Sequence, residues 1–105
     1  MPKGILQVES RPNSPEDAAG YHQWYEVHMK EISSIPGVVS ARRFVPLGED
    51  GPFIAIYELD ADDLDAVRAA ISEAGRLGTM AKPVGLRIDP PPAARYYREF
   101  TSQPS

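Results

Sequence analysis

The chain has 105 residues, of which 42% are hydrophobic and 25% charged, and its formal net charge is −4. This length and composition fit one small globular domain, residues 1–105, and exclude a disordered chain. The absence of cysteine excludes disulfides, thiolate zinc sites and a cysteine nucleophile. An acidic balance without a basic run argues against nucleic acid as a partner. No segment resembles a secretory signal or a membrane span, so we expect a cytoplasmic protein.

The stretch 14–35 has the clearest helical pattern in the chain. Ser14 can cap this helix, Pro15 suits its first turn, and Pro36 followed by glycine ends it. Helical spacing brings large side chains and one histidine to a single face, namely Tyr21, Trp24, Tyr25, His28, Ile32 and Ile35. We expect this face to pack against a sheet.

The remaining elements follow from apolar segments bounded by turn residues. Such segments predict four strands, at residues 4–9, 38–45, 53–59 and 84–89. The turn-rich stretch 46–52 joins the middle two strands into a hairpin. Acidic residues at the start of 60–74 and apolar residues at helical spacing predict a second helix there. Residues 75–83 form a connector, and the prolines at 90–92 end the fourth strand, which leaves 93–105 as a tail.

The order of the predicted elements is β-α-β-β-α-β. This is the ferredoxin-like α+β arrangement, a four-stranded antiparallel sheet with both helices on one face. Ile5 with Leu6, and Val38 with Val39, give the strands apolar residues on both faces, so the second face also needs cover. A second copy of the chain is the simplest cover. We therefore expect a homodimer, an α+β barrel, with its core in residues 4–90 and the C-terminal tail crossing to the partner.

Two segments resemble the EthD-like proteins of the dimeric α+β barrel superfamily, namely YHQWYEVHMKEISSIPGVVSARRFV and PFIAIYELD. The resemblance covers nearly the whole chain. It implies that His28 points into a pocket between the first helix and the sheet, lined by Trp24 and Tyr25. Relatives in the superfamily include cofactor-free monooxygenases, polyketide cyclases, haem enzymes and proteins without known activity. The Asn-Trp-His set of the haem-degrading monooxygenases is not reproduced here, and we expect no cofactor.

Three charged or ionisable residues are the candidates for catalysis. An imidazole such as His28 can exchange a proton near neutral pH, although a structural histidine bonded to a buried carboxylate or carbonyl fits the pattern equally well. Glu58, if it points inward, would pair with His28 and raise its pKa. Arg42 and Arg43 alternate across a strand, so one of them faces inward and needs a partner, either a carboxylate such as Glu58 or Glu9 or an anionic ligand. Either Arg42 or a tyrosine is predicted to stabilise a developing oxyanion.

Aromatic side chains accompany these candidates. They suit either a packed core or a pocket for a flat ligand, and we predict that five of them bind substrate: Tyr21, Trp24, Tyr25, Phe44 and Tyr57. His22 lies at the boundary of the helical face and is expected to be a semi-exposed surface residue. The spacing of His22 and His28 does not place both on one helical face, so no metal site is predicted.

Three functions remain open from the sequence. The first is a cofactor-independent monooxygenase, or a cyclase or isomerase, that acts on a small aromatic or polyketide-like molecule, with His28 moving the proton. The second is a non-catalytic small-molecule-binding or accessory protein of a degradation or biosynthetic cluster. The third is a dimerisation module whose interior is filled by side chains. Solvent access to His28 distinguishes the first two from the third.

Overall fold

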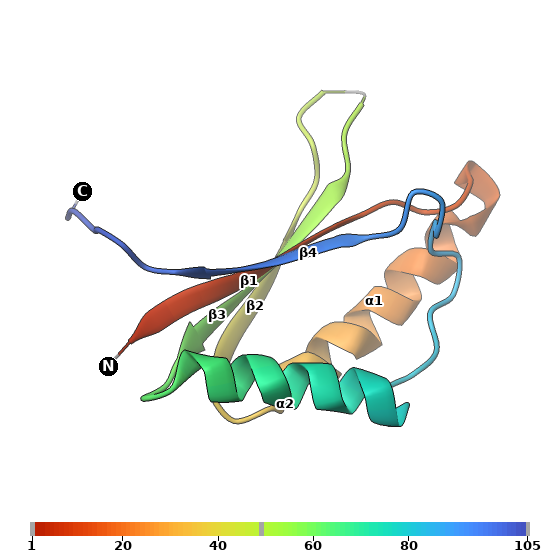
Figure 1. The fold of residues 1–105 in the computed structure, drawn as a ribbon. Helices are drawn as coiled ribbons and strands as arrows, with labels where there is room; N and C mark the ends of the chain where they lie inside the picture. Colours follow the sequence, from red (N-terminus) through yellow and green to blue (C-terminus); the bar gives the residue numbers. More distant parts are fainter. Residues whose placement is uncertain (1, 49, 105) are drawn as a thin grey trace.

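A computed structural model describes residues 2–48 and 50–104. Residues 1, 49 and 105, at the ends of the predicted domain and in the predicted turn 46–52, lie outside the described residues. The order of the elements confirms the predicted β-α-β-β-α-β fold (Figure 1). The elements are β1 (Lys3–Ser10), the 3-10 helix η1 (Pro15–Asp17), α1 (Ala18–Ser33), β2 (Val38–Phe44), β3 (Phe53–Asp60), α2 (Leu64–Leu77) and β4 (Ala93–Arg98).

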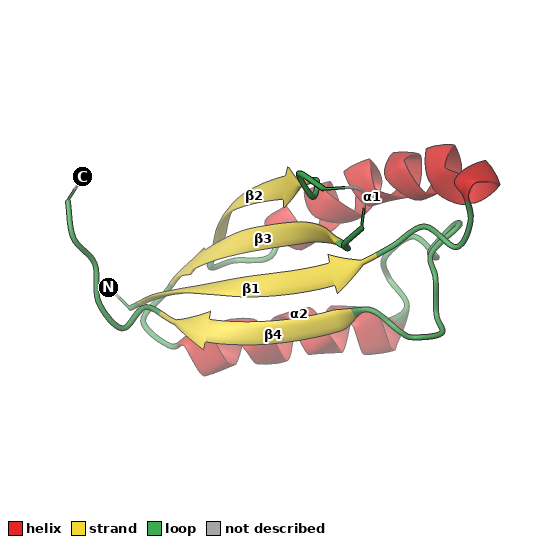
Figure 2. Cartoon of the chain, turned by 90° about the horizontal axis from the view of Figure 1, so that it is seen from above, coloured by secondary structure: helices red, strands yellow, loops and turns green. Residues whose placement is uncertain are grey.

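The four strands form one antiparallel sheet in the order β2-β3-β1-β4. Both helices lie on one side of it, here called the helix face, and the described residues leave the other side, the open face, without a covering layer (Figure 2). Leu6 of β1 pairs with Tyr57 of β3 on the helix face, whereas the preceding residue Ile5 pairs with Glu58 on the open face. Strand alternation thus fixes which side chains share a face.

The predicted fourth strand at 84–89 is wrong. Only an isolated bridge between Pro12 and Leu86 forms there, and β4 instead comprises Ala93–Arg98, which pairs along β1. The prolines at 90–92 precede the edge strand, a position where their missing N–H groups cost no ladder bond. The first part of the predicted interface tail therefore belongs to the sheet, which extends past the predicted core limit at residue 90.

The first helix has the predicted face and start. The Ser14 hydroxyl accepts a hydrogen bond from the backbone N–H of Asp17 at 3.3 Å and caps η1, which leads directly into α1. The predicted apolar face is confirmed, because four of its residues are buried and His28 and Ile35 are half-buried; the four are Tyr21, Trp24, Tyr25 and Ile32. This packing fixes α1 across the helix face of the sheet.

The second helix begins four residues later than predicted, because the side chain of Asp63 accepts a hydrogen bond from the N–H of Ala66 at 3.2 Å and sets the first turn. It packs Val67 and Ile71 against the sheet and ends at Gly78, whose φ of 69° is the left-handed conformation that glycine adopts readily. No helix of the described residues is long and apolar enough to cross a membrane.

Candidate functional site

Three buried tyrosines lie between α1 and the sheet. Tyr21 and Tyr57 are 0% exposed and Tyr25 is 2% exposed. The hydroxyls of Tyr21 and Ser10 share a hydrogen bond of 2.6 Å, whereas the Tyr57 hydroxyl has no hydrogen-bond partner among the described residues. Burial raises the pKa of Tyr25 and of Tyr57, so these hydroxyls stay protonated and can donate.

Arg43 extends from β2 into this layer of tyrosines. Its guanidinium carbon lies 4.3 Å from the ring centroid of Tyr25 and 5.4 Å from those of Tyr21 and Phe53. Its Nη1 donates to Nδ1 of His22 at 3.2 Å, while Nε and Nη2 are buried without a partner among the described residues. Aromatic rings therefore lie close to the guanidinium, and two of its donors have no partner among the described residues.

The hydrogen bond from Arg43 fixes the form of His22. Arginine has donors only, so Nδ1 of His22 must accept, which makes the imidazole neutral with its proton on Nε2. Burial and the neighbouring positive charge of Arg43 lower the pKa of His22, against an opposing effect of Glu26. His22, predicted to be semi-exposed, is half-buried, and its hydrogen bond holds the arginine in place.

His28 occupies a separate position farther along α1. Its ring stacks on Trp24 with a centroid distance of 4.8 Å and meets Tyr25 edge-on at 5.6 Å. Its Nδ1 is buried without a partner among the described residues. Burial lowers the pKa of His28, and Glu31 opposes that shift, so the imidazole is neutral at pH 7.

The connector 78–92 closes the outer side of α1. The indole Nε1 of Trp24 donates to the carbonyl oxygen of Ala81 at 3.2 Å, and the two carboxylate oxygens of Glu31 accept from the N–H of Ala81 at 3.0 and 3.1 Å. At Gly85, with φ of 66°, a Cβ would lie 2.6 Å from the carbonyl oxygen of Asp17. The connector is therefore held against the helix at both Ala81 and Gly85.

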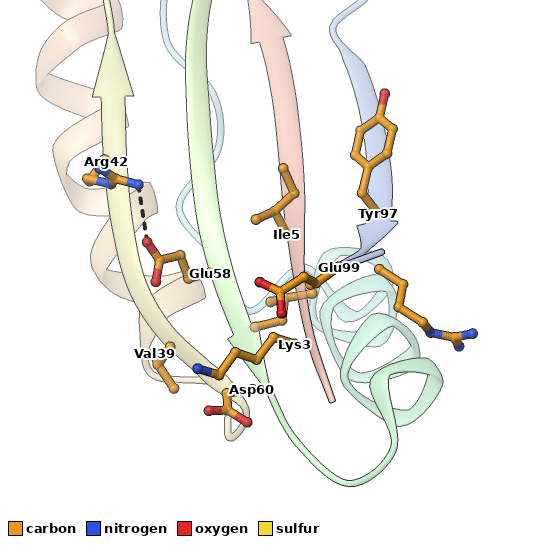
Figure 3. Close-up of a pocket in the computed structure, with 11 residues that line it drawn as sticks. Lys3, Ile5, Val39, Arg42, Glu58, Asp60, Tyr97 and Glu99 are labelled. Atoms are coloured by element: carbon orange, nitrogen blue, oxygen red, sulfur yellow. Dashed lines mark hydrogen bonds and ion pairs between the residues drawn. The ribbon is translucent and has the colours of Figure 1, made fainter. Parts of the chain in front are cut away.

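Arg42 and Glu58 lie on the open face, so the predicted pairing of Glu58 with His28 does not form. They bind each other instead, with Nη2 of Arg42 3.1 Å from Oε1 of Glu58 and side chains 61% and 46% exposed (Figure 3). Phe44, 42% exposed, lies on the same face beneath Arg42. Strand alternation explains the difference, because Tyr57 and Arg43 take the inward positions.

The described cavity with the largest volume, about 580 Å³, also lies on the open face (Figure 3). Its walls include apolar side chains such as Ile5, Val39 and Tyr97 beside charges of both signs, Lys3 and Asp60 among them. This mixed lining favours neither an anion nor a cation. The helix-face residues predicted to bind substrate do not line it.

The structure thus divides the predicted site residues into two groups. On the helix face it brings together five of them, Tyr21, Trp24, Tyr25, His28 and Tyr57. Arg42, Phe44 and Glu58 lie on the other side of the sheet, and Arg43 supplies the inward charge. No group of three or more metal-ligating side chains occurs in residues 2–48 and 50–104.

Comparisons with known proteins define the class of fold. No family model matches the chain, and no curated protein matches it significantly. The chain is similar to a crystal structure described as a "putative monooxygenase" from Shewanella loihica PV-4, with 19% sequence identity and a TM-score of 0.59, covering 97% of this chain and 99% of that one. At this identity the similarity shows the ferredoxin-like fold. The resemblance to EthD-like proteins stays a prediction.

Proposed function

We propose that the protein is a cofactor-independent monooxygenase, or a cyclase or isomerase, of the EthD-like dimeric α+β barrel type, acting on a small aromatic or polyketide-like molecule. The observation that carries the proposal is the Arg43 guanidinium held among tyrosines between α1 and the sheet. Cofactor-free oxygenation starts from an electron-rich substrate anion, and polyketide cyclisation starts from an enolate. A fixed positive charge beside the substrate oxygen favours both.

The two ionisable groups that contact Tyr25, neutral His28 and positively charged Arg43, have different roles in this proposal. His28, kept neutral by its burial, takes the proton from the substrate. Arg43 holds the resulting anion. In the oxygenation, a methylene carbon becomes a carbonyl: one atom of O₂ enters the substrate, and the other leaves as water with the two hydrogens of that carbon.

The partner in this proposal is a second copy of the chain. On the open face, Val39, Phe44 and Tyr97 are 60, 42 and 48% exposed, and Ile5 and Ile56 are half-buried there. Pairing two open faces would remove this apolar surface from water. In this arrangement the helix face lies outside the dimer interface.

A non-catalytic binding or accessory protein is the second candidate function. It is favoured by the unpartnered donors of Arg43, because binding at these donors needs no proton transfer by His28. The complete burial of Tyr21 and Tyr57, which fill the layer between α1 and the sheet, favours instead the dimerisation module.

Oxygen uptake with a panel of small hydroxylated aromatic and polyketide-like compounds, in metal-free buffer, tests the proposal. We expect turnover of at least one compound, with a loss of at least about tenfold in Arg43→Gln. Arg76→Gln is the matched control, because Arg76 is 69% exposed on α2 and binds only Glu73. Stoichiometric binding without oxygen uptake or conversion of any compound would support the second function.

A further inference from the structure

We propose that Arg43 is a binding site for a planar conjugated anion whose negative charge is shared by two coplanar oxygens. A carboxylate on an aromatic ring and the enolate of a 1,3-diketone both have this chemistry. The inference deepens the proposed function, on which it rests, by specifying the charge and shape of the ligand.

The two free donors of Arg43 explain the preference for two oxygens. Nε and Nη2 form the side edge of the guanidinium, where two N–H bonds point in parallel, and both atoms are buried without a partner in the described part of the chain. Buried donors without hydrogen bonds are costly, and an anionic ligand would supply the acceptors that these two donors lack. Two coplanar oxygens match the edge with two parallel, charge-assisted bonds.

The surroundings of Arg43 explain the preference for a flat, apolar ligand body. The ring centroids of Tyr21, Tyr25 and Phe53 lie within 5.4 Å of the guanidinium carbon, so a ligand bound to the edge also contacts aromatic side chains. The Tyr57 hydroxyl is buried in the same layer, next to Tyr25.

No carboxylate of the chain competes for Arg43 in the described structure. Its hydrogen-bond partner is neutral His22, and the carboxylate of Glu58 is bound to Arg42 on the opposite face of the sheet. His22, Arg43 and Phe53 are each half-buried, whereas Nε and Nη2 of Arg43 are fully buried, so a ligand reaches this edge only when the surrounding side chains move apart.

Binding of benzoate and benzamide tests the inference. They have the same shape, but only benzoate carries two anionic oxygens. We expect benzoate to bind at least about tenfold tighter, and to shift the NMR signal of the Arg43 Nε–H. Arg43→Gln should weaken benzoate binding about 10- to 100-fold, while Arg76→Gln should not change it.

Arg43→Lys is the second variant, because it keeps the charge but lacks the paired donors. It should lower benzoate affinity about tenfold, and thermal melting will show that each variant is folded. Benzoylacetone, which forms a 1,3-diketone enolate, separates an enolate site from a carboxylate site. The inference would be overturned if benzoate and benzamide bound equally well or if neither bound. It would also be overturned if Arg42→Gln lost benzoate binding while Arg43→Gln kept it.

The outcomes separate this inference from the proposed function. Benzoate binding at Arg43 without turnover of any aromatic or polyketide-like compound would support the inference and overturn the enzymatic function. Turnover that survives Arg43→Gln, in a protein that does not distinguish benzoate from benzamide, would support the enzyme and overturn the inference.

Discussion

Replacement of Arg43 by methionine should make the protein more stable. Nε and Nη2 of Arg43 are buried donors without partners among the described residues, and each such donor costs about 1–3 kcal/mol. The substitution also loses the bond to His22, about 1 kcal/mol, and the cation–π contacts, about 1–2 kcal/mol. Methionine fills a similar length with apolar atoms. The net expectation is stabilisation by about 1 kcal/mol, which raises Tm by about 5 °C in a domain of this size.

Thermal and urea unfolding followed by circular dichroism will measure this change. Arg42→Met is the matched control, since Arg42 is the neighbouring residue but is 61% exposed and makes only a surface ion pair. The control should change stability by less than about 0.5 kcal/mol. A drop of several degrees in the Tm of Arg43→Met would refute the reasoning, because it would mean that the two donors are satisfied in the folded protein without a ligand.

Four further predictions concern other parts of the molecule. His28→Ala should reduce turnover at least about 100-fold in a folded protein, and a fully active variant would exclude proton transfer by His28. Burial holds the pKa of His28 below 6.5, so the unfolded chain binds more protons and the free energy of unfolding falls as the pH drops below about 6.5. In unfolding measured from about pH 7 to 5, His28→Gln should make the free energy of unfolding depend less steeply on pH. An unchanged pH dependence contradicts the pKa shift. Ile5→Glu on the open face should turn a dimer into a monomer in light scattering, and an unchanged mass would place the interface elsewhere. Gly85→Ala should lower the free energy of unfolding by about 2 kcal/mol, because Gly85 has a φ of 66° and lies close to the Asp17 carbonyl. Gly78→Ala, at a similar φ but with no atom within 4 Å, should lower it by about 1 kcal/mol. Equal losses of stability would show that the contact with Asp17 is unimportant.

The sequence was sufficient to predict the first helix and the order of elements. The start and end of this helix are set by residues close to it in the sequence, namely its periodic apolar face, Ser14 and Pro36-Gly37. Such local preferences agree with the folded structure in natural proteins, so they predict the helix without knowledge of the tertiary fold. The fourth strand was misplaced because the segment 84–89 has as strong an apolar pattern as 93–98. The path of the connector decides which of the two segments pairs with β1. That path depends on tertiary contacts, which the local sequence pattern does not show.

The choice between the two arginines could not be made from the sequence. Alternation shows that Arg42 and Arg43 face opposite sides, but the assignment depends on the start of β2, where the register shifts between Val38 and Ser40. A shift of one residue exchanges the faces of every following side chain. Ala41 packs against the core on the helix face, and Arg43, two residues later, faces the same side. An inward Ala41 would therefore have predicted an inward Arg43, but a small residue alone is a weak sign of burial.

The two helices pack on the sheet in chemically different ways. Below α2 the fully buried side chains are Val67, Ile71 and Leu59, which need no hydrogen bonds, and Tyr96 is half-buried there against Arg68. Below α1 the chain buries three tyrosines, part of a guanidinium and the edge of an imidazole, several of them without partners among the described residues. Burial of unpaired polar groups lowers stability, and an apolar layer like that of α2 would avoid the loss. The unpartnered polar groups under α1 therefore lower the stability of the fold, and the proposed binding of an anion at Arg43 would give two of these donors a partner.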